Sequence, residues 1–141
     1  MRTKINSFYS EGTKDVRNEL FDKLAEAIAG DFICRDGKVT KTQLRRLYNE
    51  VKRFELMLDG SPEKWKKNYP YIRKIKAVAN YSILRAKQQM SYSENKDVYD
   101  DLSAFLTEGI DLIKDEQDYR VFTALFEAVY GFYCVKNPKN D

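Results

Sequence analysis

The sequence predicts an all-α protein, a single-domain helical bundle of about five main helices and one short helical turn. Three observations lead to this fold class. Apolar residues recur at spacings of three and four along most of the chain, several of the segments that carry them begin at good N-cap residues, and strand signals are poor. With 141 residues, the chain is also long enough to bury one core without disulfide bonds or metal ions.

Two segments precede the helix with the strongest signals. Residues 1–12 are polar with a few aromatic side chains, and we expect them to form a loose N-terminal arm. A helix is expected over 13–29, ending at Gly30, a residue suited to a left-handed C-cap. The apolar residues at helical spacing in this segment are Val16, Leu20, Leu24 and Ile28. The link 31–37 contains a short apolar run, 32–34, for which the sequence offers no partner strand.

The next helix has clear start signals. Thr40 is a good N-cap, and Gln43 three residues later completes a capping box. Val39 can pack on Leu44 as a hydrophobic staple. We expect this helix to end near Asp59-Gly60. Its core face carries Leu44, Leu47, Tyr48, Val51, Phe54 and Leu58.

A proline at position 70 divides the region that follows. Ser61 and Pro62 are typical cap and first-turn residues for a short helical turn over 63–68. We expect Pro70 to interrupt this turn, so that a longer helix covers 71–89. The residues expected to face inward are Tyr71, Ile72, Ile75, Val78, Ala79, Ile83 and Ala86. Its two flanks carry separate sets, which are Arg73, Lys76 and Lys87 on one side and Lys74, Tyr81 and Arg85 on the other.

Two further helices complete the predicted bundle, one over 98–114 and one ending near residue 135. The candidate caps are Asn95 or Asp97 for the first and Asp115 or Asp118 for the second. The inward stripe of the first is Val98, Leu102, Phe105, Leu106, Ile110 and Ile113. The inward stripe of the second is Tyr119, Phe122, Leu125, Phe126, Val129, Tyr130 and Tyr133.

The predicted domain organisation is an arm over 1–12, one helical domain over 13–135 and a tail over 136–141. The linkers 31–37 and 90–96 are long enough for a helix to cross to a second copy, so the isolated chain can form a homodimer by exchanging helices. No apolar run approaches the length of about 18 residues needed to span a membrane. We therefore expect a cytoplasmic protein without membrane contacts.

Charge is distributed unevenly along the chain. The net charge is +3, yet residues 38–87 carry 14 basic and 4 acidic side chains, a net of +10. Residues 91–141 carry 5 basic and 11 acidic side chains, a net of −6. Such a dipolar molecule is suited to present one surface to a polyanion and another that repels it or contacts a basic neighbour.

The sharpest functional signal is the polar face of the helix that begins after Thr40. Basic side chains lie about one turn apart on this face, a spacing that suits a row of phosphates. These residues are Lys41, Arg45, Arg46, Lys52 and Arg53. The alternative is a helical protein-interaction adaptor whose basic face is only solvated. Nothing marks base-specific recognition, so an RNA ligand would be bound through its backbone and shape.

Aromatic residues are interleaved with these bases, as in proteins that stack single-stranded bases. The residues concerned are Tyr48, Trp65, Tyr69, Tyr71 and Tyr81. Because Tyr48 and Tyr71 fall in apolar arcs, we expect only Trp65 and Tyr69 to be free for stacking.

The composition argues against an enzyme. Histidine is absent, which removes the commonest general base and most zinc sites. Cys34 and Cys134 are far apart in sequence and are expected to be ordinary buried residues. A metal-dependent nuclease would have to use Asp97, Asp100, Asp101, Asp111, Asp115 and Glu116. No spacing among these acids singles out ligands, and we expect no catalytic residue, metal or cofactor.

Three blocks of the sequence resemble a known family, the small helical subunit of type III-A CRISPR effector complexes (the Csm complex). The blocks are Thr40-x-x-Gln43-Leu44-Arg45-x-Leu47-Tyr48, then Lys76 with Tyr81 and Arg85, then Phe122 with Glu127-Ala128 and Tyr133. The resemblance covers roughly residues 39–134. Val78 stands where the family often has a second lysine, and Cys134 stands where a histidine is common.

The resemblance implies a non-catalytic RNA-binding subunit, stacked in several copies along a channel that holds guide RNA paired to target RNA. Its implied partners are the guide and target RNA and other subunits, including further copies of itself. With Lys87 added from the flank of Lys76, the residues expected to contact phosphate are Lys41, Arg45, Arg46, Lys52, Arg53, Lys76, Arg85 and Lys87. Lys76 and Arg85 lie on opposite flanks of their helix, so one of the two can pair with a neighbouring helix instead.

Overall fold

The computed structural model describes residues 2–139 and is mainly helical, which confirms the predicted all-α class with five main helices. Met1 of the predicted arm and residues 140–141 of the predicted tail lie outside the described residues. The elements in chain order are a π-helix η1 (Leu20–Leu24), α1 (Ala25–Asp31), β1 (Ile33–Cys34), β2 (Gly37–Lys38), α2 (Lys41–Leu56), α3 (Pro62–Gln89), α4 (Asp97–Asp111) and α5 (Glu116–Lys136). None of these helices is both long enough and apolar enough to span a lipid bilayer.

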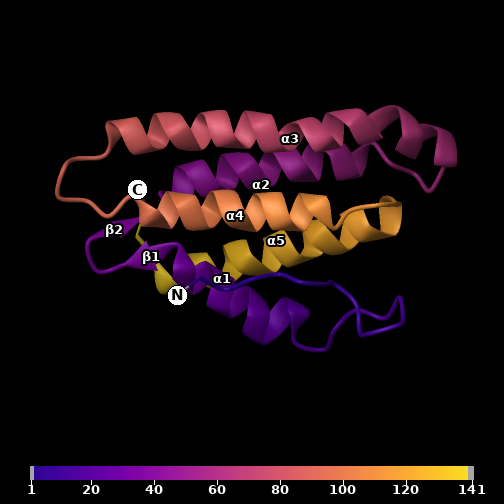
Figure 1. The fold of residues 1–141 in the computed structure, drawn as a ribbon, viewed down its shortest axis with the longest axis horizontal. Helices are drawn as coiled ribbons and strands as arrows, with labels where there is room; N and C mark the ends of the chain where they lie inside the picture. Colours follow the sequence, from indigo (N-terminus) through magenta and orange to yellow (C-terminus); the bar gives the residue numbers. More distant parts are fainter. Residues whose placement is uncertain (1, 140–141) are drawn as a thin grey trace.

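The helices form a bundle in which α3 and α1 lie at opposite edges, with α2, α4 and α5 between them (Figure 1). α5 packs against α1 and α2, while α3 packs against α4 and α2. One core contains buried residues from every helix. At its centre the ring of Phe105 lies 5.7 Å from that of Phe122 and 5.3 Å from that of Phe126.

The start of α2 is fixed as predicted, but its capping box is only half formed. The hydroxyl of Thr40 accepts a hydrogen bond from the backbone N–H of Gln43 at 3.2 Å. The side-chain amide of Gln43 donates to Ser82 of α3 instead of returning to Thr40. The backbone N–H of Thr40 donates to the hydroxyl of Tyr99 in α4 at 3.2 Å. The first turn of α2 is therefore tied to α3 and α4.

The prediction that Pro70 interrupts the chain was wrong, because α3 is one continuous helix from Pro62 to Gln89. Ser61 caps it as predicted, accepting from the backbone N–H of Lys64 at 3.3 Å. A proline inside a helix removes one backbone hydrogen bond and strains the preceding turn. The burial of α3 against α2 and α4, through residues such as Ile72 and Ile75, outweighs that cost.

Two residues expected to face inward on α3 are exposed. Tyr71 is 55% exposed and Val78 is 47% exposed, so these predictions were wrong. The buried stripe consists of Ile72, Ile75, Ala79 and Ile83. Tyr71 and Val78 each precede a member of this stripe by one residue, which places them about 100° around the helix and outside the core.

The first helix begins later than predicted. The segment before Leu20 is not helical, and Val16 instead forms a bridge with Tyr9. α1 continues through Gly30 to Asp31. Because Gly30 does not have a positive φ, the predicted left-handed C-cap was wrong.

The described part of the N-terminal segment is packed on the bundle, although it was expected to be loose. Ile5 and Phe8 are buried. The backbone N–H of Ile5 donates to Glu108 of α4 at 3.1 Å, and the guanidinium of Arg2 lies 2.7 Å from the same carboxylate. The hydroxyl of Tyr9 donates to Asp118 of α5 at 2.5 Å. These contacts hold the segment across α4 and α5.

The apolar run after α1 does have a partner strand, contrary to the prediction. β1 pairs antiparallel with β2, with Cys34 opposite Gly37. The hairpin touches the linker before α4, because the backbone N–H of Asn95 donates to the carbonyl of Asp36 at 2.9 Å. A Cβ at position 37 would overlap the backbone of Asn95, so this approach requires glycine. The side chain of Asn95 accepts from the N–H of Asp97 at 2.9 Å as α4 begins.

α5 begins at the predicted cap Asp115, whose carboxylate accepts from the backbone N–H of Asp118 at 2.9 Å. The buried hydroxyl of Tyr119 donates to the carbonyl of Val51 in α2 at 2.6 Å. The hydroxyl of Tyr133 donates to the carbonyl of Val39 just before α2. α5 thus fixes the position of α2 at both ends.

Candidate nucleic-acid interface

One side of the polar face of α2 lies against α5. The guanidinium of Arg45 donates to the hydroxyl of Tyr130 at 3.1 Å. The ring of Tyr48 is stacked on that of Tyr130, with centroids 5.8 Å apart and planes 8° from parallel. The hydroxyl of Tyr48 donates to Glu127 at 3.0 Å. Tyr48 was expected to belong to the core, but it is only half-buried and helps to hold Arg45 in place.

The two lysines predicted on this side of α2 are engaged by the fold. Lys41 is a buried residue at the first position of α2. The ammonium of Lys52 lies 2.8 Å from the carboxylate of Glu55, and this hydrogen bond raises the pKa of Lys52. Both lysines are therefore less available to a ligand than Arg45.

The other side of the polar face of α2 lies against α3. Glu50, Arg53, Tyr71 and Lys74 are among the residues that line a shallow groove of about 120 Å³ between the two helices. The guanidinium of Arg53 is 2.7 Å from the carboxylate of Glu50. Arg46 lies seven residues before Arg53, on the same side of α2. Arg46 is exposed and forms no ion pair with the rest of the described chain.

The basic residues of α3 are divided between two faces. On the face toward α4, Lys76 lies 2.6 Å and Arg73 lies 3.4 Å from the carboxylate of Asp111. Lys87 lies 2.7 Å from Asp100. The hydrogen bond from Lys76 holds the pKa of Asp111 below its usual value. As the sequence predicted, Arg73, Lys76 and Lys87 share one flank, and there each of them pairs with an acid of α4.

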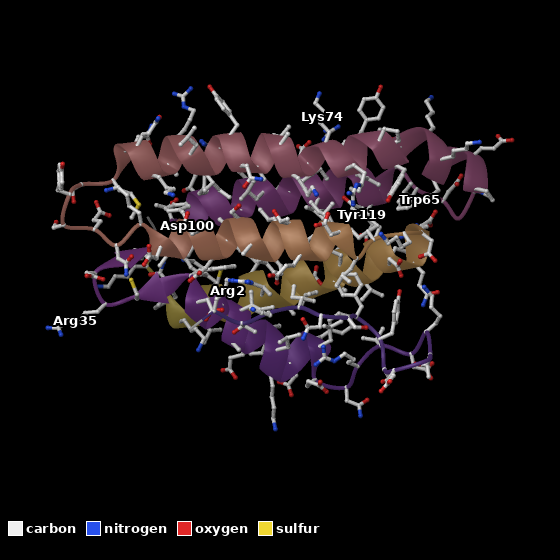
Figure 2. The ribbon with its side chains drawn as sticks, in the orientation of Figure 1. Arg2, Arg35, Trp65, Lys74, Asp100 and Tyr119 are labelled. Carbon is white, nitrogen blue, oxygen red and sulfur yellow. The ribbon has the colours of Figure 1, made fainter. Side chains whose placement is uncertain are left out.

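On the face of α3 that points away from the bundle, the basic residues have no such partners. Figure 2 shows Lys74 on this side. Lys74 and Arg85 are exposed and form no ion pair among residues 2–139. The guanidinium of Arg85 donates to the hydroxyl of Tyr81 on the same face at 3.3 Å. Lys66 and Lys67 add two further exposed bases near the start of the helix.

The aromatic residues expected to be free for stacking are packed instead. Trp65 and Tyr69 are half-buried with ring centroids 5.2 Å apart, and the hydroxyl of Tyr69 donates to the carbonyl of Ile113 at 3.2 Å. The exposed rings of α3 are Tyr71 and Tyr81, the latter 60% exposed.

Lys74 and Tyr71 were therefore missed as candidate site residues. The regular stripe of buried isoleucines and Ala79 on α3 would have placed Tyr71 outside the core, because it lies one residue before that stripe begins.

The acids considered for a nuclease are distributed over separate structural contacts. Asp100 and Asp111 pair with bases of α3, Asp115 caps α5, and Glu116 pairs with Arg120 at 2.8 Å. Among the residues that the structure describes, no three carboxylate or thiol side chains are grouped as a metal site requires.

A comparison with known protein families identifies the chain. The model of the Csm2 Type III-A family matches residues 15–138, which include all the helices and both sides of α2. The chain belongs to the Csm2 family. No curated protein and no solved structure matched it. As a Csm2 protein it is a structural small subunit of type III-A CRISPR complexes, which confirms the family resemblance of its sequence.

Proposed function

We propose that this Csm2 protein is a non-catalytic RNA-binding subunit, which holds the phosphate backbone of guide and target RNA without reading sequence. The observation that carries the proposal is a set of exposed bases on α2 and α3, two of which, Arg53 and Lys74, line the groove between these helices. We call this set the α2–α3 basic surface and define it as Arg46, Arg53, Lys67, Lys74 and Arg85. Its partners are the two RNA strands and the other subunits of the complex, including further copies of itself.

The pairing pattern of α3 supports this proposal over a solvated face. Where α3 meets another helix, its bases Arg73, Lys76 and Lys87 are matched by acids. On its outer face, Lys74 and Arg85 have no acid within the described chain. Unpaired bases gathered in one place favour a polyanion, because phosphate binding releases the counterions of the RNA.

The other residues predicted to contact phosphate differ in how much we expect them to contribute to RNA affinity. Arg45 donates one N–H to Tyr130, and its remaining guanidinium donors can bind a phosphate. Lys52, Lys76 and Lys87 already have carboxylate partners, so a phosphate would have to replace an existing ion pair. We propose that these three contribute less to RNA affinity than Arg45 and the unpaired bases of the α2–α3 basic surface. Arg53 is paired with Glu50 and would bind a phosphate through the guanidinium donors that this ion pair leaves free. Lys41 is buried and has the least room for a ligand.

The test is the salt dependence of binding to labelled single-stranded RNA, measured by fluorescence anisotropy. The slope of log affinity against log salt is about −0.7 per neutralised phosphate for single strands. For Arg45→Ala/Arg46→Ala/Arg53→Ala we expect the slope to become shallower by about 2, because three contacts are removed. The matched control is Lys4→Ala/Lys23→Ala/Lys139→Ala, which removes the same charge from exposed positions outside this surface.

Two outcomes would contradict the proposal. One is the absence of RNA binding by the native chain at low salt, and the other is an equal loss of slope in both triple variants. Either result would favour the adaptor, which predicts partner binding that salt does not affect. The helix-exchanged homodimer stays a prediction, and light scattering over a range of protein concentrations tests it.

A further inference from the structure

The outer face of α3 carries a regular row of basic and apolar side chains. The row consists of Lys67, Tyr71, Lys74, Val78, Tyr81 and Arg85, at alternating intervals of four and three residues. Such intervals keep all six side chains on one side of a helix. Each of these residues is exposed. We call this set the outer row of α3.

The two tyrosine rings of the outer row form few contacts within the fold: Tyr71 borders the groove between α2 and α3, and the guanidinium of Arg85 lies 5.9 Å from the ring centroid of Tyr81. Neither Tyr71 nor Tyr81 packs against another aromatic ring in the described chain, and the hydroxyl of Tyr71 forms no hydrogen bond there. The hydroxyl of Tyr81 accepts only from Arg85, which belongs to the same row. Trp65 and Tyr69, in contrast, are integrated into the core. Large exposed rings with few structural contacts are typical of a binding surface.

The charge around these rings selects the kind of ligand. No acidic residue occurs from Lys64 to Gln89, and the bases of the outer row have no acid partner among the described residues. The carboxylate of Glu50, which borders the groove between α2 and α3, is already paired with Arg53. A ligand that matches the row must therefore carry negative charge and flat apolar groups close together. Unpaired nucleotides have both, since each has a phosphate and an open base face.

We propose that the outer row of α3 binds unpaired RNA nucleotides, with bases stacked on Tyr71 and Tyr81 and phosphates held by Lys74 and Arg85. This proposal rests on the proposed function and extends it, because backbone binding alone does not distinguish single strands from duplex. Stacking tolerates any base, so the absence of sequence recognition is retained. In a duplex the bases are covered by their neighbours, and the two rings have nothing to stack on.

The test compares single-stranded and duplex RNA of equal length over a series of salt concentrations. Tyr71→Ala/Tyr81→Ala should bind the single strand at least about 5-fold more weakly than the native chain, because each lost base stack weakens binding. The salt slope should stay unchanged, since no charge is removed. Duplex affinity should change by less than about twofold, because the rings have no open base face there. Tyr71→Phe/Tyr81→Phe should restore the affinity, because the ring faces remain.

Tyr92→Ala is the matched control, because Tyr92 is fully exposed and lies near Lys96, but in the linker before α4. It should bind both RNAs like the native chain. If the native chain binds with a steep salt slope and the alanine variant binds equally well, this inference is wrong while the proposed function stands. The outer row would then be a contact surface for another protein subunit. An equal loss for duplex and single strand would also refute base stacking, and a native chain that binds no RNA would overturn both proposals.

Discussion

The ammonium of Lys76 and the carboxylate of Asp111 lie 2.6 Å apart and join α3 to α4. Lys74, only two residues earlier, is exposed on the opposite flank and has no acid partner within the described chain. Two basic residues that are close together on one helix therefore have different roles. One neutralises an adjacent helix, and the other is available to an external anion.

This contrast gives a prediction with its own control. Lys74→Met should make the salt slope of RNA binding shallower by about 0.7 with little change in stability. Lys76→Met should leave the slope nearly unchanged and lower the free energy of unfolding by about 0.5 kcal/mol, the usual scale of a surface ion pair. Anisotropy titrations and urea unfolding of both variants measure these effects. Equal losses of slope would show that Lys76 leaves Asp111 when RNA binds.

The contact between α4 and α5 requires glycine at position 109. A Cβ at this position would overlap the ring of Phe122. Gly109→Ala should lower the free energy of unfolding by about 2 kcal/mol, because overpacking of the core outweighs the better helix propensity of alanine. Gly131→Ala in α5 is the control, since a Cβ there meets nothing within 4 Å. It should stabilise the protein by about 0.7 kcal/mol, and urea unfolding that found both variants stabilised would contradict the predicted clash.

Replacing Pro70 should stabilise α3. Pro70→Ala restores a backbone hydrogen bond inside the helix and removes the clash of the ring with the preceding turn, together worth about 3 kcal/mol. It loses about 1 kcal/mol because the unfolded chain becomes less restricted. We expect a net gain of about 2 kcal/mol in thermal or urea unfolding. Pro62→Ala is the control. At the first helical position a backbone N–H has no hydrogen-bond partner within the helix, so alanine gains no hydrogen bond there. A gain of similar size at both positions would mean that Pro70 does not strain the helix.

The N-terminal segment should become less firmly attached in acid. Burial raises the pKa of Asp118, but hydrogen bonds from Tyr9, from the backbone of Lys114 and from Lys14 outweigh burial and lower it. A carboxyl group whose pKa is lowered by folding stabilises the native state above its unfolded pKa of about 4, and this contribution disappears as the pH falls through the folded pKa. Asp118→Asn should lower the free energy of unfolding by about 2 kcal/mol at pH 7 and by less at pH 3.

Urea unfolding at the two pH values tests this prediction. Asp22→Asn controls for the loss of one negative charge, because Asp22 is exposed on η1. A cost for Asp118→Asn that is the same at pH 3 and pH 7 would exclude the carboxylate as the source of the effect.

The sequence predicted well those features that depend on neighbouring residues. Thr40, Ser61 and Asp115 cap their helices as expected, because a cap is decided by one side chain and the backbone within three residues. The stripe of α4 is buried as expected, and so is that of α5 except for the half-buried Tyr130, because their period is regular. Pro70 and Gly30 were misjudged, since tertiary burial of a helix overrides the local preference of a single residue.

Features of the candidate site that depend on another helix were harder to predict. The sequence cannot show that Lys76 faces Asp111, because the two residues are brought together only by the packing of α3 on α4. The half-burial of Trp65 depends on its packing beside Tyr119 of α5. The exposure of Tyr71, in contrast, could have been predicted from the regular buried stripe of α3. Ile5 and Phe8 lie in an irregular segment without periodicity, so nothing local indicated their place in the core.

Under the proposed stacking on the outer row, the continuity of α3 sets a length threshold for an RNA ligand. Tyr71 and Tyr81 are ten residues apart on one unbroken helix, which separates their Cα atoms by about 15 Å along its axis. Stacked nucleotides advance about 3.4 Å per step, so roughly four steps lie between the two rings. A dinucleotide or trinucleotide can therefore occupy only one ring. Affinity should rise sharply, and not in proportion to length, once an oligonucleotide is long enough to reach both.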